Sequence, residues 1–290
     1  MVWRSSGVSW QGGAPRLRWA GAGGRVSPLP YGRELGFRAV GERRCSGARG
    51  NPCPLAAAVP GRSTGGRCAE CARLDRAHSV AADTIADDPR PYRVYLAWFG
   101  PGMVKVGITG EERGSARLLE QGAIAFAWLG RGPLMAARRT EEVLRHALAV
   151  PDRIPYARKR AVRYALPPAE ERARELTELY GQAAGVPAWA ETLQALPCQV
   201  QDHAEAFALH ALASSPPGHV VTELVAGRLV AAAGPDLHLL DADDRPLVLD
   251  TRLLTGWELA AAPAGHPVTV PTAAAPAPTC ADAAAQAPLF

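Results

Sequence analysis

Two short apolar runs around a Gly-Pro-Gly turn constrain the fold of this chain most. The stretch "YRVYLAWF" (92–99) is rich in aromatic and β-branched residues, and "MVKVGI" (103–108) follows the turn with a similar composition. This pattern predicts two antiparallel strands joined by a tight turn. The second strand carries Lys105, one of two lysines in a chain with 30 arginines. A lysine at this place is typical either of an exposed edge strand or of a functional position.

The residues after this hairpin predict a helix, a third strand and a second helix. The segment 111–121 has the composition of a short helix, which Gly122 ends. The run "AIAFAWL" (123–129) predicts a strand, and the segment 133–150 predicts a helix with Pro133 near its first turn. The order strand-strand-helix-strand-helix indicates the α+β class.

Composition divides the rest of the chain. A Gly/Ser-rich start and an Ala/Pro/Thr-rich end predict disorder at both termini. Short apolar runs between turn signals predict a small antiparallel unit near the C-terminus, and helices precede it, one of them at 202–213. We therefore expect a disordered segment 1–15, a β and zinc-binding segment 16–80, a core 92–166, a helical segment 167–215, an antiparallel β unit 216–260 and a disordered tail 261–290.

The net charge of +4 is unevenly distributed along the chain. Residues 1–80 carry a net charge of +9 and residues 81–165 one of +5, whereas residues 166–290 carry −10. A basic first half favours a polyanion such as nucleic acid as the partner. Two oppositely charged faces that attract each other within one fold would give the same pattern.

Hydropathy bears on the cellular location of the protein. No segment has 18 or more apolar residues, so we expect no transmembrane helix. The N-terminus lacks the apolar region of a secretory signal. We therefore expect a cytoplasmic protein, in which thiols stay reduced and six cysteines favour metal ligands over disulfides.

Four of the cysteines follow the spacing C-x7-C-x14-C-x2-C. Cys68 and Cys71 have the tight spacing that lets one turn direct two thiolates at a metal, whereas Cys45 and Cys53 require the residues between them to loop out. The set predicts a closed structural zinc site in an arginine-rich segment that faces nucleic acid. Unrelated reduced thiols are the alternative interpretation.

A carboxylate lies on the apolar side of the second predicted helix. On a helical wheel Leu134 and Leu144 belong to one apolar stripe, and Glu141 falls within it. An unpaired buried carboxylate is costly, so Glu141 either pairs with Arg138 or Arg145 or holds a ligand or metal.

The ordered set of elements and motifs resembles the GIY-YIG nuclease superfamily, and more closely the bacterial family catalogued as domain of unknown function 2797. The resemblance is carried by "YLAWFG", "KVGIT", "ARLLEQGA" and "RRTEEVL", together with the upstream cysteines. It covers about residues 40–170 well and the rest of the chain loosely.

This resemblance implies roles for individual residues. Tyr95 matches the tyrosine of the first motif, and Glu141 matches the glutamate that binds Mg²⁺ or Mn²⁺. Arg117, or else Arg113, matches the arginine that grips the scissile phosphate. Lys105 replaces the tyrosine of the second motif, as a base with a lowered pKa or as a phosphate clamp. The basic segment after the second predicted helix would add phosphate contacts through Arg158, Lys159 and Arg160.

The chain ends in "QAPLF" after the expected disordered tail. This ending looks like the short peptide by which bacterial DNA polymerases and repair proteins dock on the sliding clamp. Gln286 would donate or accept a hydrogen bond, while Leu289 and Phe290 would fill an apolar pocket. Docking of the tail on its own domain is the alternative.

The sequence therefore predicts a zinc-containing nucleic-acid-binding protein, with DNA as the expected partner. The first hypothesis is a structure-selective endonuclease that depends on Mg²⁺ or Mn²⁺ and acts in DNA repair or processing. The second is a non-catalytic binder in which Lys105 and Arg117 hold phosphate. The third is a regulatory module that binds a ligand or a protein through the strands expected at 219–259.

Overall fold

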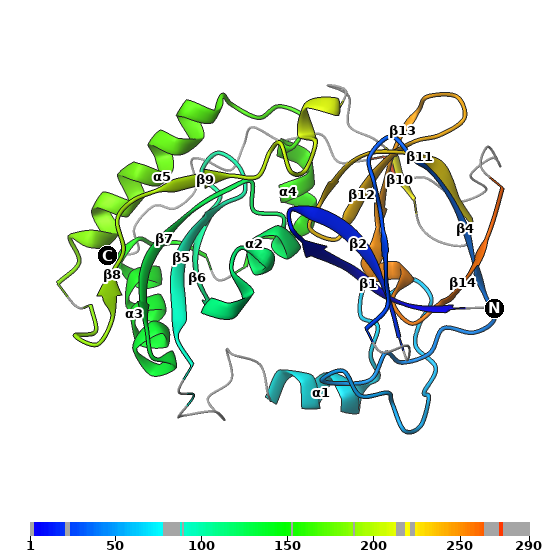
Figure 1. Cartoon of the computed structure of the whole chain (residues 1–290), viewed down its shortest axis with the longest axis horizontal. Coiled ribbons are helices and arrows are strands. Elements are labelled where there is room, and N and C mark those ends of the chain that lie inside the picture. The colour runs from blue at the N-terminus through cyan, green and yellow to red at the C-terminus, as the bar shows by residue number, and fades with distance from the viewer. Residues whose placement is uncertain are drawn as a thin grey trace, which may run out of the picture.

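The computed structural model contains two β-sheets, with the helices α2 (Ala116–Gln121) and α4 (Tyr156–Val162) between them (Figure 1). None of its helices has the length and apolar character that a membrane span requires, within the part of the chain that is described. The structure describes residues 3–20, 24–77, 88, 90–151, 153–187, 189–212, 218–220, 224–263 and 273–274.

The smaller sheet contains the predicted hairpin at one edge. Strands β5 (Tyr92–Trp98) and β6 (Val104–Gly110) pair antiparallel, and β7 (Ala125–Gly132) pairs with the other side of β5. Two short strands, β8 (Gln194–Ala195) and β9 (Val200–Asp202), extend the sheet beyond β7, so that β6 forms its opposite edge. The predicted order of strands and helices is found, and the chain belongs to the α+β class.

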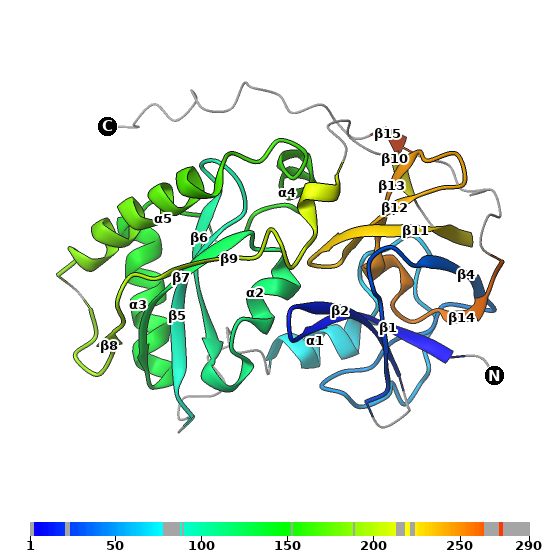
Figure 2. The ribbon, with the colours of Figure 1, turned by 45° about the horizontal axis from the view of Figure 1, so that its top comes forward.

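Helices cover both faces of this sheet. Helices α3 (Leu134–Ala147) and α5 (Ala169–Ala184) lie on the side away from the larger sheet (Figure 2). Successive side chains of β5 point to opposite faces of the sheet. Leu96 packs in the core that α3 and α5 share, whereas Tyr95 packs with Leu118 of α2 on the opposite face.

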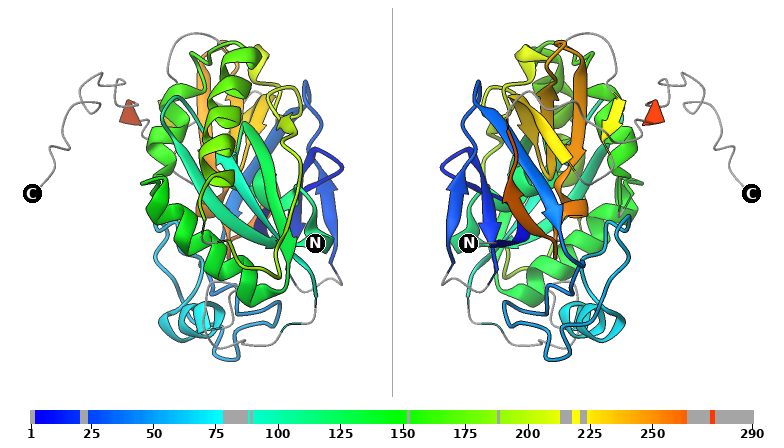
Figure 3. Two further views of the ribbon diagram at one scale, coloured as in Figure 1. Left: turned by 90° about the vertical axis from the view of Figure 1, so that its left-hand side faces the viewer. Right: turned by 90° about the vertical axis from the view of Figure 1, so that its right-hand side faces the viewer.

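The larger sheet joins the two ends of the described chain. Strand β4 (Glu34–Val40) lies between β11 (Leu224–Ala233) and β14 (Glu258–Ala261), and β14 also pairs with β1 (Trp3–Gln11). Figure 3 shows the N-terminal strands beside the C-terminal ones in its right-hand view. The other members of the sheet are β2 (Ala14–Trp19), β3 (Val26–Pro28), β10 (Gly218–Val220), β12 (Asp236–Leu240), β13 (Pro246–Asp250) and β15 (Ala273–Ala274).

The expectation of disorder at 1–15 is wrong for the residues of β1. Trp10 is buried, and its indole N–H donates to the Gly234 carbonyl at 3.0 Å. The register shift between Ser5 and Val8, with Gly7 at a φ of +89°, breaks the alternation that reveals a strand. The strand forms because it pairs with β14, more than 240 residues away in sequence, which local composition does not show.

The expected unit at 216–260 differs in two ways. It is not separate, because β4 and β1 complete its sheet, and β10 pairs with β13 in parallel rather than antiparallel. The helix expected at 202–213 is replaced by a turn and the short 3-10 helix η2 (Leu209–Ala211), because β9 pairs with β7 and the His203 amide donates to Ile124. Within 167–215 the α-helical part is α5.

A buried ion-pair network fixes α4 against the larger sheet. The Asp236 carboxylate accepts from Arg160 at 2.6 Å and from Arg163 at 2.7 Å, and both Asp236 and Arg163 are fully buried. Arg160 also pairs with Asp250 at 2.6 Å. Burial raises the pKa of Asp236, but Arg163 and Arg160 outweigh it and leave the pKa below its ordinary value.

We expect Asp236→Asn to lower the free energy of unfolding by about 3–5 kcal/mol, because it leaves Arg163 buried without its counter-charge. The matched control is Asp244→Asn, which removes the exposed pair with Arg228 and should cost less than about 1 kcal/mol. Denaturant midpoints of the two variants and of the parent protein test this prediction. Equal midpoints would show that the buried network does not hold the two sheets together.

Candidate functional site

A cleft of about 1420 Å³ brings together side chains from elements that are distant in sequence. Tyr95 of β5, Lys105 of β6, Arg117 of α2 and Glu141 of α3 all line it. Of the residues expected to add phosphate contacts, Arg113, Lys159 and Arg160 line the cleft as well, whereas Arg158 is exposed outside the lining.

Tyr95 is held in one position at the base of this cleft. Its ring is 1% exposed, and its hydroxyl accepts a hydrogen bond from Gln121 Nε2 at 3.0 Å. Burial raises the pKa of Tyr95; Gln121, Arg117 and Arg113 act in the lowering direction, and Glu141 adds to the rise. The phenol is therefore neutral at pH 7 and has a proton to donate.

The close approach of Tyr95 explains why the motif "KVGIT" contains a glycine at position 107. It pairs with Tyr95 across β5 and β6, and a Cβ at this position would lie 2.4 Å from the tyrosine hydroxyl. Any larger side chain would therefore displace the ring. The glycine lets the phenol reach the cleft.

The remaining three predicted catalytic residues differ in exposure. Arg117 is exposed, while Lys105 and Glu141 are half-buried. Lys105 lies on the edge strand of its sheet, as one interpretation expected, and its side chain also lines the cleft. Arg138 and Arg145, the expected partners of Glu141, line the same cleft. The carboxylate therefore lies among cations and at the surface of the cavity.

The cleft has a strongly basic lining. Ten of the side chains around it are arginine or lysine and four are aspartate or glutamate. Some of these cations have carboxylate partners: Arg113 pairs with Glu120 at 2.7 Å, and Arg160 and Arg252 both pair with Asp250. An excess of positive charge in a concave surface concentrates anions there.

The cysteine segment forms part of the same cleft. Arg49, in the loop between the first two cysteines, and Asp75, of helix α1 (Ala69–Ala77), both line it. The Arg49 amide donates to the Asp75 carboxylate at 3.4 Å, and Arg67 pairs with Asp75 at 3.2 Å. The arginine-rich segment thus contributes to the basic surface, as the sequence predicts for this region.

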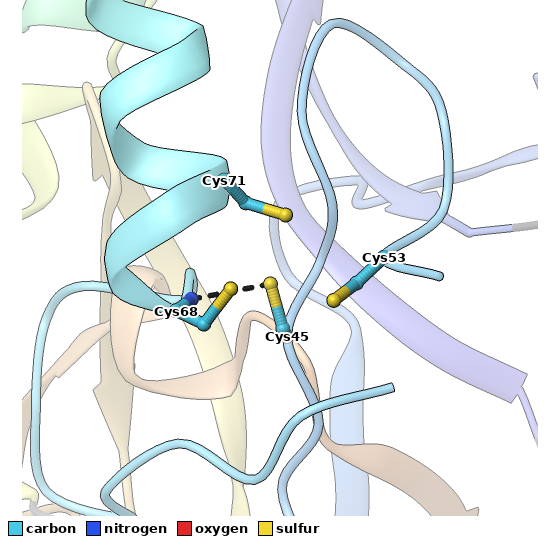
Figure 4. Close-up of side chains that lie close together, drawn as sticks. All are labelled: Cys45, Cys53, Cys68 and Cys71. Carbon is cyan, nitrogen blue, oxygen red and sulfur yellow. Dashed lines mark hydrogen bonds between the residues drawn. The ribbon is translucent and has the colours of Figure 1, made fainter. Parts of the chain in front are cut away.

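The four cysteines converge on one point (Figure 4). The Sγ atoms of Cys45, Cys53, Cys68 and Cys71 all lie within 4.8 Å of one another. Cys45 Sγ accepts hydrogen bonds from the Cys68 amide at 3.2 Å and from the Gly47 amide at 3.4 Å. Such N–H donors stabilise thiolates, so the segment is arranged to hold negative sulfur atoms.

The loop between the first two cysteines folds out as expected. It turns at Gly47, which has a φ of +78° and whose added Cβ would lie 1.9 Å from the Asn51 carbonyl oxygen. No other residue fits this position. The loop closes through reciprocal hydrogen bonds between Ala48 and Asn51.

The pKa values of the thiols indicate that the four sulfur atoms need a cation among them to be ionised together. A hydrogen bond from the Ala57 amide lowers the pKa of Cys53 to about 7, whereas burial and the neighbouring thiols raise that of Cys71 to about 12. Four crowded sulfur atoms cannot all ionise unless a positive charge lies among them. The donor set therefore fits a metal ion such as zinc, bound by four thiolates.

Arg43 fastens this segment to the larger sheet. It is 1% exposed, and its guanidinium donates only to backbone carbonyls among its described hydrogen bonds. Thr255 and Arg252, which follow β13, accept two of them, and Pro60 and Ser63 of the cysteine segment accept two more. The buried cation thereby cross-links two parts of the chain.

Several lining residues were not predicted from the sequence. Gln121 precedes the glycine that ends α2 and lies within the motif "ARLLEQGA", but no role was predicted for it. Arg252 belongs to the 3-10 helix η3 (Thr251–Leu254), far along the chain from the core. The expected clamp-binding residues Gln286, Leu289 and Phe290 lie outside the described residues.

We expect Cys53→Ala to abolish stoichiometric metal binding, because three thiolates cannot close a tetrahedral site. The matched control is Cys198→Ala, which removes a half-buried thiol that does not belong to the cluster. Elemental analysis of the untagged protein should give about one ion per chain for the parent and the control. A parent protein that contains no metal after purification in metal-containing buffer would contradict the assignment.

Comparison with known proteins gives a family. A search of curated proteins and a search of solved structures each returned no significant match. A scan of family models matches residues 32–259, which include the cysteine segment, the smaller sheet and most of the larger sheet. The chain therefore belongs to the family described as "Protein of unknown function (DUF2797)".

Proposed function

We propose that this protein binds nucleic acid in the basic cleft and cleaves a phosphodiester there with the help of a divalent metal ion. The observation that carries the proposal is that Tyr95, Lys105, Arg117 and Glu141, from four elements, line one cavity. The excess of cations around that cavity suits a polyanionic substrate.

The resemblance to GIY-YIG nucleases supports this choice. The first strand of the hairpin is central in the smaller sheet, and the two motif strands pair so that Tyr95 lies opposite Gly107. The arginine and the glutamate then come from the next two helices, α2 and α3, which is the order that the resemblance implies.

Each side chain suits a distinct task in such a reaction. Arg117 offers a planar fork to phosphate oxygens, and Lys105 adds a compact positive charge. Glu141 would hold Mg²⁺ or Mn²⁺, an ion that supplies charge neutralisation and acidifies bound water. Tyr95, neutral and oriented by Gln121, would donate a hydrogen bond to a phosphate or leaving-group oxygen.

Zinc is the ion that we propose for the cysteine cluster. Four thiolates in a closed arrangement are the donor set of structural zinc sites, and no coordination position remains for a substrate. The ion would maintain the loop that carries Arg49 into the cleft wall. Its role is therefore to shape the binding surface.

A non-catalytic binder is the second candidate. It is favoured by Lys105, a cation where the second motif has a tyrosine, because a protonated lysine cannot take a proton from water. In that case the cleft would hold phosphates and cut nothing. The two candidates share the binding surface and differ only in cleavage.

The first test measures cleavage. Purified protein is incubated with branched, flapped and single-stranded DNA and RNA, with and without Mg²⁺ or Mn²⁺. We expect Tyr95→Phe and Glu141→Gln each to reduce cleavage by about 100-fold or more, because each removes a group that acts on the reacting phosphate. The control Glu191→Gln changes an exposed carboxylate outside the cleft and should keep the parent rate. Cleavage that survives both cleft substitutions would show that this site is not its source.

The second test measures binding alone. Arg117→Gln should weaken binding to every nucleic-acid sequence alike and reduce the slope of log K against log salt by about one. The control Arg174→Gln removes an exposed arginine of α5 outside this cleft and should leave the slope unchanged. Fluorescence anisotropy at several salt concentrations gives both quantities. A parent protein with no affinity at low salt would exclude both candidates.

A further inference from the structure

Both lysines of the chain line the same cleft. The remaining 30 basic side chains are arginines, of which eight contribute to this lining. Lysine differs from arginine in one chemical respect: only the lysine amine can lose its proton near neutral pH and then act as a nucleophile. The position of the two lysines therefore bears on the chemistry of the cleft.

Lys159 is buried against aromatic rings in the lining of the cleft. The side chain is 5% exposed, and its Nζ lies 3.7 Å from the centroid of the Phe99 ring and 4.6 Å from that of Tyr156. Nζ donates a hydrogen bond to the Gln121 carbonyl at 3.0 Å. A neutral amine can keep this bond, with its lone pair still available.

The charged groups around Lys159 come from several elements. Burial, followed by the positive charges of Lys105 on β6 and of Arg163 at the end of α4, lowers the pKa of Lys159 to about 7. Asp236 on β12 acts in the opposite direction, and Arg252 on η3 adds a further positive charge. A buried amine beside a second lysine is the arrangement that activates lysine nucleophiles.

We propose that Lys159 is an amine nucleophile that forms an imine with an aldehyde carried by a phosphate-bearing ligand in the cleft. The basic lining binds the phosphate, with Lys105 and Arg117 as cations at the cleft wall. The Nζ lone pair attacks the carbonyl carbon and forms the C–N bond. The carbonyl oxygen leaves as water with the two amine protons, so the step needs neither an oxidant nor a reductant.

Two sources provide this ligand chemistry. An abasic site in nucleic acid exposes a sugar aldehyde between two phosphates, and small phosphorylated aldehydes carry both groups in one molecule. That the ligand is a nucleic acid rests on the proposed function, whereas the amine chemistry of Lys159 does not. The experiment therefore uses one probe of each kind, an abasic DNA duplex and pyridoxal 5′-phosphate.

The chain suits a direct chemical test, because it has three amines in all, the N-terminus, Lys105 and Lys159. The full-length protein is incubated with each probe and a borohydride reductant from pH 6 to 10.5, and peptide mapping locates the adducts. We expect reduction to fix an adduct on Lys159 with a rate that is half-maximal near pH 7, instead of near the ordinary 10.5. Lys159→Arg should remove this adduct.

Substitutions of the neighbour give a matched pair. Lys105→Met removes a nearby cation and should raise the half-maximal pH for labelling of Lys159, whereas Lys105→Arg keeps the charge and should leave that pH unchanged. The profile of the parent protein needs no variant, so misfolding of a variant does not affect it. No adduct on Lys159 with either probe, or labelling that rises steadily up to pH 10.5, overturns the proposal.

The probes separate this inference from the proposed function. An adduct with the abasic duplex supports both the amine chemistry and nucleic acid as the ligand. An adduct with pyridoxal 5′-phosphate alone, from a protein that fails the anisotropy test for nucleic-acid binding, supports the amine chemistry and assigns a small phosphorylated aldehyde as the ligand. In that second case the proposed function fails and the role of Lys159 stands.

Discussion

The buried carboxylate of Asp236 is the interaction on which the relation of the two sheets depends. It pairs with Arg160 of α4 and with Arg163, which caps the C-terminal end of this helix, and so holds the helix against β12. Lys159, directly before Arg160 in sequence, contacts instead the Phe99 ring, after β5 of the smaller sheet, and the Gln121 carbonyl of α2. One short helix therefore contacts both halves of the molecule, and the cleft lies where they meet.

The two arginines and the lysine at α4 differ in whether their surroundings require them to be ionised. The two arginines must remain ionised, because their partner is a carboxylate with no access to water. The lysine before them has no carboxylate bonded to it among its described contacts, and its burial, followed by the charges of Lys105 and Arg163, lowers its pKa. A network that fixes the fold and an amine that is easily deprotonated thus lie within one turn of helix.

The sequence predicted the features that depend on neighbouring residues and missed those that depend on contacts between residues far apart in the chain. The hairpin, α2 with its end at Gly122, and α3 follow from patterns of a few residues, and the cysteine spacing predicted the cluster. Strand β1 was missed because its neighbours in the sheet, β14 and β2, include one from the other end of the chain. For the same reason Arg252 could not be assigned to the cleft, while Tyr95 and Glu141 could. Two adjacent basic residues also differ in exposure. Arg158 is exposed and Lys159 is buried, and the composition of this segment does not predict that difference.

The choice between arginine and lysine carries information in this chain. Wherever a cation serves an ion pair or a carbonyl, as at Arg43 and Arg163, the residue is arginine, which stays charged even when buried. The two exceptions are Lys105 and Lys159, and burial, followed by the charge of Lys105, lowers the pKa of Lys159. If Lys105 served only to bind phosphate, arginine would do so with more hydrogen bonds. Lys105 also supplies a positive charge near Lys159, and that charge adds to the effect of burial in lowering the pKa of this second amine.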